Sequence, residues 1–237
     1  MEDLLLKSGR AQREDGLQTR ENLMDAAEEL FATCGFRLTS IRDIVDMVGC
    51  NIAAVNYHFG GKENLYLEVF RRRVSSLREV TLNRIERLHE HDSPPPTLEI
   101  ILESYAEAFI EPLVEDSKGR YMMLLFSREL TDPHIAPEFL LTELVEPIEE
   151  ALGEAIGSAC PDLDAEDVRV CIQLFIAQLV HLLRMQDYFG LVGRKRTPLS
   201  VSKKTIRTIV RFSAGGVRAM GNKPKKAPRH RKSETKR

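Results

Sequence analysis

The sequence predicts an all-α protein, in which an N-terminal three-helix helix-turn-helix domain precedes a larger C-terminal helical domain, with about nine helices in all. Apolar residues recur at helical spacing along nearly the whole chain, and no clear run alternates with the period of two that is typical of a half-buried strand. With 237 residues, of which 43% are hydrophobic, the chain is long and apolar enough for one or two domains with real cores.

Four parts are expected along the chain: a flexible polar arm (1–17), the helix-turn-helix domain (18–66), the C-terminal domain (67–221) and a disordered basic tail (222–237). The first helix should run from Gln18 to Cys34, with Gly35 as its stop.

A short second helix follows, because four apolar residues share one helical face at i, i+3, i+4 and i+7: Ile41, Ile44, Val45 and Val48. Thr39 or Ser40 can cap its start through a hydroxyl group, and Gly49 can end it in the left-handed conformation.

A third helix begins after Cys50, with Val55 and Phe59 turned toward the core. The residues left to face outward are Asn51, Ile52, Ala54, Asn56, Tyr57 and His58. Two short helices joined by a tight turn with glycine read as a helix-turn-helix, whose second helix enters the major groove of DNA. An amide can read a base edge there, and a phenol or an imidazole can reach phosphate.

Four further residues flank these helices as candidate contacts to the DNA backbone: Thr39, Ser40, Arg42 and Lys62. Lys62 stands at a helix start beside two glycines, where the helix N-terminus adds attraction for an anion. Thr39 and Arg42 have an alternative role in capping and solvating the second helix. His58 has an alternative role in bridging the third helix to the first.

Residues 18–70 resemble the TetR family of one-component bacterial transcription regulators. The resemblance rests on the spacing of Gly35-Phe36, Thr39-Ser40, Ile44, Gly49, Tyr57-His58-Phe59 and Lys62. The segment NIAAVNYHFGGKENLY resembles the CecR-type branch, which carries its own type of C-terminal domain. Three residues depart from the usual family pattern: Val45, Cys50 and Ile52.

The resemblance implies a cytoplasmic homodimer that binds a palindromic operator in double-stranded DNA, and it favours a role as a repressor. A small-molecule effector is expected to release this dimer from the operator. The alternative from another class is a helical protein-interaction module without specific DNA binding. Ile52 and the acidic balance of the chain are its support.

The C-terminal domain should hold helices at about 62–90, 97–114, 118–130, 136–158, 164–189 and 201–220. The domain boundary is expected inside the first of these, where Arg71–Arg73 should form a solvated face. Pro147 should kink the fourth helix, and the helix at 164–189 is apolar almost all round, which indicates burial on more than one side. Together with the last helix it should form the dimer interface.

A small-molecule cavity is expected among the helices of this domain. The candidate lining residues are Tyr105, Phe109, Met122, Met123, Phe126, Gln178 and His181. Gln178 and His181 are polar groups on an otherwise apolar helix, and buried polar groups need partners. An equally open interpretation places these two residues at the dimer interface, and the apolar candidates could be plain core.

Charge is strongly segregated along the chain. Residues 1–73 carry 10 basic and 12 acidic side chains, residues 74–189 carry 8 and 23, and residues 190–237 carry 16 and 1. The DNA-binding domain is therefore not basic overall, so attraction to phosphate must come from local placement of Arg42 and Lys62, with the arm as a further candidate source: Lys7, Arg10, Arg13 and Arg20. For the basic tail, simple solvation, non-specific attraction to DNA and folding onto the acidic middle all stay open.

No catalytic motif, cofactor or metal site is predicted, since the chain has no Gly-rich phosphate loop, HExxH or GxSxG. The four cysteines show no CxxC pairing, which fits a reducing cytoplasm. No stretch of 18 apolar residues and no signal-peptide hydrophobic region occurs, so no membrane segment is expected.

Overall fold

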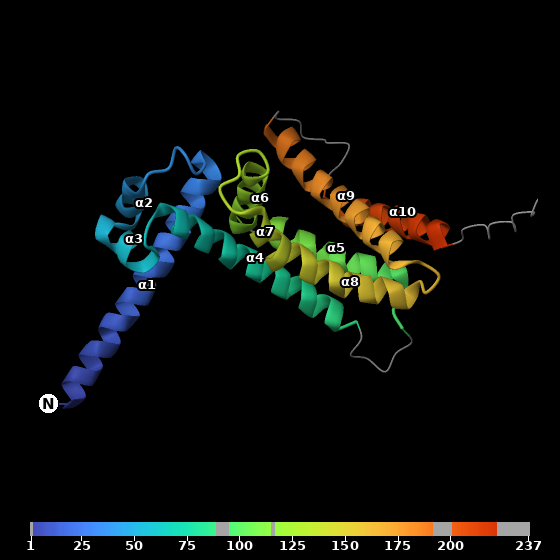
Figure 1. The fold of residues 1–237 in the computed structure, drawn as a ribbon. Coiled ribbons are helices and arrows are strands. Elements are labelled where there is room, and N and C mark those ends of the chain that lie inside the picture. The colour runs from blue at the N-terminus through green and yellow to red at the C-terminus, as the bar shows by residue number, and fades with distance from the viewer. Residues whose placement is uncertain (1, 89–94, 115–116, 192–200, 222–237) are drawn as a thin grey trace, which may run out of the picture.

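The computed structural model describes residues 2–88, 95–114, 117–191 and 201–221, and these residues form helices and their connections with no strand among them (Figure 1). The all-α prediction is confirmed. The N-terminal helices are α1 (Glu2–Cys34), α2 (Ile41–Val48), α3 (Ile52–Phe59) and α4 (Lys62–Glu86). The remaining helices are α5 (Leu98–Val114), α6 (Ser117–Glu129), α7 (Pro137–Leu140), the π-helical turn η1 (Leu141–Val145), α8 (Glu146–Ala159), α9 (Ala165–Leu191) and α10 (Lys203–Gly221).

The ends of α2 and α3 follow from local chemistry. Ser40 caps α2 in a reciprocal capping box with Asp43, and Gly49 ends the helix with a φ of 75°. The side chain of Asn51 accepts a hydrogen bond from the Ala53 amide at the start of α3, and Gly60 ends that helix with a φ of 76°. These caps fix the tight angle between the two helices.

Two hydrophobic cores share α4. Its first half contributes Leu65, Val69 and Phe70 to a core with α1, α2 and α3, and its second half contributes Leu77 and Ile85 to a separate core with α5, α8, α9 and α10. Figure 1 shows α4 running from the small N-terminal group of helices along the larger helical body. One continuous helix therefore links the two halves of the molecule.

A second link is α6, which lies between the N-terminal helices and the body in Figure 1 and packs on α1 and α5. Leu125 belongs to the N-terminal core, Met122 belongs to the C-terminal core, and Phe126 packs against both. At Gly119, α6 lies so close to α5 that a Cβ there would collide with the Pro112 carbonyl oxygen.

Two helices differ from the sequence prediction. The first begins at Glu2 and not at Gln18, so the segment expected to be a flexible arm continues α1. The helix expected at 136–158 is divided by the π-helical turn η1, and Pro147 opens α8. Proline has no N–H to donate to the carbonyl four residues earlier. That carbonyl, at Glu143, accepts a hydrogen bond of 2.7 Å from the Arg78 guanidinium of α4.

The helix α9 is the longest apolar element of the body. Its segment Ala165–Met185 is long and apolar enough to cross a membrane by length and composition, a test that core helices of soluble proteins also pass. In the structure it packs on α5, α8 and α10. The predicted basic tail (222–237) lies outside the described residues.

Candidate nucleic-acid interface and helical-domain cavity

The helix α3 has one buried and one exposed face, in the phase that the sequence indicates. Val55 is fully buried and Phe59 nearly so, whereas the Tyr57 side chain is 85% exposed. Asn51, Ile52 and Asn56 are exposed beside Tyr57, and Ala54 and His58 are half-buried. The exposed face offers amide and phenol groups together, which are groups that can contact base edges and phosphates.

The start of α2 supplies the neighbouring surface. Ser40 and Arg42 are both exposed. The Ser40 hydroxyl donates to a carboxylate oxygen of Asp43, and the Ser40 amide donates to the same oxygen. These backbone and side-chain hydrogen bonds hold the pKa of Asp43 below its usual value. The resulting charged Asp43 stabilises the positive end of the helix dipole.

Thr39 departs from the prediction. Its side chain is only 2% exposed, and its hydroxyl lies 3.1 Å from the Leu30 carbonyl oxygen and 2.9 Å from that of Gly35. The hydroxyl is therefore used inside the domain, where it ties the turn after α1 to that helix, and it is not presented to a phosphate. Of the two predicted caps, Ser40 fills the role.

Lys62 stands at the first position of α4, as the sequence indicates. Its ammonium lies over the ring of Phe36, with Nζ 4.3 Å from the ring centroid. A cation at this distance from an aromatic face is attracted by the ring. The contact fixes the lysine between the turn after α1 and the glycine pair before α4, and half-buries it.

Of the three arginines Arg71–Arg73, Arg71 is exposed as the sequence predicts, whereas Arg72 and Arg73 are partly buried. Glu28 of α1 is 1% exposed, and its carboxylate accepts from Arg72 at 2.6 Å and from Arg73 at 2.5 Å. Arg72 also pairs with Asp25 at 2.8 Å. A buried carboxylate requires such partners, so this cluster clamps α1 to α4. Sequence periodicity could not reveal it, because its members lie more than forty residues apart.

A second clamp joins the C-terminal end of α6 to the N-terminal helices. Arg128 donates from Nε to the Ala32 carbonyl at 2.9 Å and from Nη2 to the Thr33 carbonyl at 2.6 Å, which satisfies two of the last carbonyls of α1. Arg37 forms a two-pronged pair with Asp132, at 2.9 and 2.8 Å.

Glu129 is the buried centre of this second clamp, at 5% exposure. One carboxylate oxygen accepts from the backbone amides of His134 and Ile135, both at 2.6 Å, and the other accepts from the Tyr66 hydroxyl at 2.9 Å. Burial and the Glu129 carboxylate raise the pKa of Tyr66 above its ordinary value. This site is not predicted from the sequence, because nothing in the local pattern marks Arg128 or Glu129.

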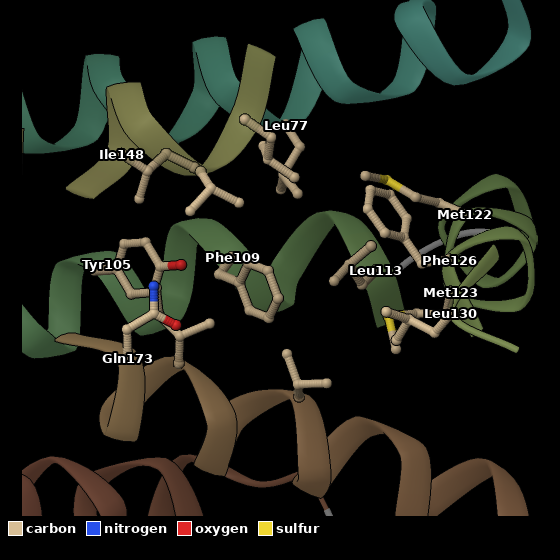
Figure 2. Close-up of a pocket in the computed structure, with 14 residues that line it drawn as sticks. Leu77, Tyr105, Phe109, Leu113, Met122, Met123, Phe126, Leu130, Ile148 and Gln173 are labelled. Carbon is tan, nitrogen blue, oxygen red and sulfur yellow. The ribbon is translucent and has the colours of Figure 1, made fainter. Parts of the chain in front are cut away.

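A cavity of about 200 Å³ lies in the C-terminal core between α4, α5, α6, α9 and the start of α8 (Figure 2). All five apolar or aromatic candidates line it: Tyr105, Phe109, Met122, Met123 and Phe126. Further lining residues were missed because, in sequence, they are ordinary apolar core positions: Leu77, Leu113, Leu130, Leu144, Val145, Ile148, Ile176 and Val180.

Gln178 and His181 do not line this cavity, which corrects the predicted polar anchor. The cavity face of α9 carries Gln173, Ile176 and Val180, and Gln178 points elsewhere around the helix. Its amide donates to Ser213 of α10 at 3.0 Å, and His181 is exposed. Among the α9 side chains that the structure describes, the polar one in the lining is Gln173.

Comparison with known proteins assigns the family. The family model for bacterial regulatory proteins of the tetR family matches residues 23–69, and the model for the tetracyclin repressor-like C-terminal domain matches residues 103–216. The protein belongs to the TetR family. The resemblance seen in the sequence is thereby confirmed for both halves of this TetR-family chain.

Relatives of this TetR-family protein are transcription regulators. The HTH-type transcriptional regulator AcrR of Shigella flexneri is 23% identical over 69% of this chain and 76% of its own length. The HTH-type transcriptional dual regulator CecR of the same organism is 29% identical over 66% of this chain and 71% of its own length. This agrees with the resemblance of the α3 sequence to the CecR-type branch.

Solved structures share the fold. A TetR family transcription regulator from Marinobacter aquaeolei VT8 covers 86% of this chain and 97% of its own, with a TM-score of 0.61 and 16% identity. The multidrug binding protein EbrR, solved with imidazole, covers 82% of this chain and 93% of its own, with a TM-score of 0.53 and 17% identity.

Proposed function

We propose that this TetR-family regulator binds a palindromic operator as a homodimer and represses transcription until a small molecule in the C-terminal cavity releases it. The observation that carries the proposal is the outer face of α3, where Asn56 and Tyr57 are exposed while Val55 and Phe59 anchor the helix. Arg42 and Lys62 flank this face with positive charge, which suits contacts to phosphate.

An exposed apolar surface supports the homodimer. Val170 and Leu174 of α9 are 46% and 59% exposed, and Phe212 of the adjacent α10 is 75% exposed. Soluble monomers rarely expose apolar residues in contiguous patches, so a second copy of the chain is the natural cover. Two-fold pairing would place two α3 helices on successive major grooves, about 34–36 Å apart.

The connection between cavity and DNA helix runs along α6. Met122, Met123 and Phe126 line the cavity, and Arg128 and Glu129 hold the N-terminal helices one turn later. A ligand that pushes on the cavity-lining residues of α6 must move or strain the contacts of Arg128 and Glu129. An effector shifts the population of conformers only if it binds them unequally, and a helix shared by both sites can provide that inequality. That EbrR was solved with imidazole supports a small-molecule effector for this fold.

Purified protein mixed with labelled duplex from the region just upstream of its own gene tests the proposal. Fluorescence anisotropy should show saturable binding that an unlabelled copy competes away and a scrambled duplex does not. Equal binding to the scrambled duplex at physiological salt would reject specific operator recognition and favour the protein-interaction alternative.

A further inference from the structure

The cavity has an uneven distribution of polar atoms. Figure 2 shows the Tyr105 hydroxyl and the Gln173 amide at one end, and Met122, Met123 and Phe126 at the other. Every other lining side chain is apolar, and no Asp, Glu, Lys, Arg or His belongs to the lining formed by the described residues.

Tyr105 presents an unused donor. The residue is 1% exposed, and burial raises the pKa of its phenol above the ordinary value, so the hydroxyl keeps its proton. Within the part of the chain that the structure describes, no group accepts a hydrogen bond from this hydroxyl. The hydroxyl borders the cavity, so a ligand oxygen at this end of the cavity can accept its hydrogen bond.

Charged ligands lack a counter-ion here. The carboxylate that touches the lining, Glu149, accepts a hydrogen bond from Gln173 and borders a separate groove between α8 and α9. A carboxylate or an ammonium placed among Leu77, Phe109 and Ile148 would lose its hydration without a paired charge, which costs far more than burying a neutral group.

The size of the cavity further narrows the class of ligand. A dry apolar cavity of roughly 150 Å³ holds one benzene molecule. The cavity of about 200 Å³ in this protein therefore suits a slightly larger molecule, and the two methionines at its α6 end can adapt their shape to it.

We infer that the effector of this regulator is a neutral, largely apolar molecule, about the size of one substituted ring, that offers a carbonyl or ether oxygen to the Tyr105 hydroxyl. The inference rests on the proposed function, because it names the ligand of the same cavity. The apolar body of the ligand lies toward α6, against Met123 and Phe126, where it can act on the clamp at Arg128.

Matched probes separate charge from shape. Calorimetry on the full-length protein without DNA compares acetophenone with benzoate, and 3,3-dimethylbutanol with choline, since the members of each pair are similar in size. The neutral member of each pair should bind at least about 100-fold more tightly, because the charged one is buried without a counter-ion. Benzoate or choline binding as tightly as its neutral counterpart overturns the inference, as does failure of both neutral probes to bind at millimolar concentration.

The Tyr105 contact has its own control. Tyr105→Phe should weaken acetophenone by about 2- to 12-fold, the worth of one net hydrogen bond, and should leave ethylbenzene, which lacks the oxygen, unchanged. Equal weakening of both probes would mean that the phenol acts only through packing. Leu144→Phe, which fills the cavity, should abolish binding, whereas the same change at exposed Leu141 on the same turn should not.

The proposed function fails separately from this inference. If acetophenone binds as described but leaves operator affinity unchanged, the ligand class stands and the effector role falls. If operator binding is specific and none of the neutral probes binds, the DNA-binding role stands and the ligand class falls.

Discussion

At the scale of single residues, exposure separates side chains that are free to contact DNA from those that build the domain. Thr39 and Tyr57 were both candidate contacts, yet one is 2% exposed and the other 85%. Within the described parts of the chain, the contact recorded for the exposed phenol is its edge against the His58 ring. Residues of this kind can be changed without loss of stability, which makes their role testable.

Tyr57→Ala should weaken operator binding by about 1–3 kcal/mol, the range for one good contact in the groove. The melting temperature should stay the same, because so exposed a side chain contributes little to the core. Anisotropy and thermal melting on the same preparation measure both quantities. Val80→Ala, an exposed apolar residue on α4 away from α3, is the matched control. Unchanged operator affinity for Tyr57→Ala would remove Tyr57 from the interface.

Glu28→Gln should destabilise the protein by about 3–5 kcal/mol, because it removes the buried carboxylate that pairs with Arg72 and Arg73; Arg72 keeps its ion pair with Asp25, but Arg73 loses its acidic partner. Chemical denaturation measures the change. Glu29→Gln, on the neighbouring and more exposed position of α1, should change the free energy of unfolding little. A similar small effect for both variants would show that the α1–α4 clamp does not stabilise the domain.

At the scale of elements, α4 and α6 both contribute described residues to each of the two hydrophobic cores. The helix α4 carries a continuous backbone from one core to the other, whereas α6 reaches the N-terminal helices through side chains. Arg128 and Glu129 form that contact, and Phe126 lies in the cavity wall just before them. Rearrangement of side-chain contacts requires less energy than breaking a helix, so α6 is the better candidate for transmitting a ligand signal.

Arg128→Ala should therefore uncouple the cavity from the DNA helix. Ligand affinity of the free protein should change less than about twofold, while the ligand-induced loss of operator affinity should shrink by about 1–3 kcal/mol, the usual size of a coupling free energy. Operator titrations with and without a bound neutral ligand give this difference. Arg120→Ala, an exposed arginine on the same helix, should keep the full ligand response. The idea falls if both variants respond alike.

At the scale of the whole molecule, charge and apolar exposure divide the surface by function. The described body between α5 and α9 is rich in carboxylates, which discourages its approach to DNA, and the exposed apolar residues of α9 and α10 lie on adjacent helices. The proposed reading of a palindrome by a dimer needs this separation, because the proposed dimer face and the proposed DNA face must both be free to act.

Leu174→Glu combined with Phe212→Glu should convert the dimer into a monomer of 26.9 kDa, as light scattering would report. The cost of burying two unpaired charges on each copy exceeds the free energy gained from burying the apolar surface of a standard interface. Operator affinity should fall with the loss of two-site binding. Ile100→Glu, which places a charge on an exposed position of α5, should leave the dimer intact. Wild-type protein that scatters as a monomer at micromolar concentration would contradict the proposed assembly.

The sequence by itself determined the helical class, both ends of α2, the start of α3 and the inward phase of Val55 and Phe59. These features depend on residues within a few positions of each other, where capping chemistry and helical periodicity act directly. It also indicated that Tyr105 and Phe109 lie near a cavity, because aromatic and methionine residues gathered at helical spacing on two helices.

Only the tertiary structure decided which polar groups work inside the fold. Glu28 meets Arg72 and Arg73, and Glu129 meets Tyr66, across sequence separations that no local pattern encodes. The same holds for α9, where the packing of neighbouring helices selects Gln173 for the cavity and turns Gln178 toward α10. Each of these choices depends on how one helix is rotated against another, and that rotation is set by side-chain packing between distant segments.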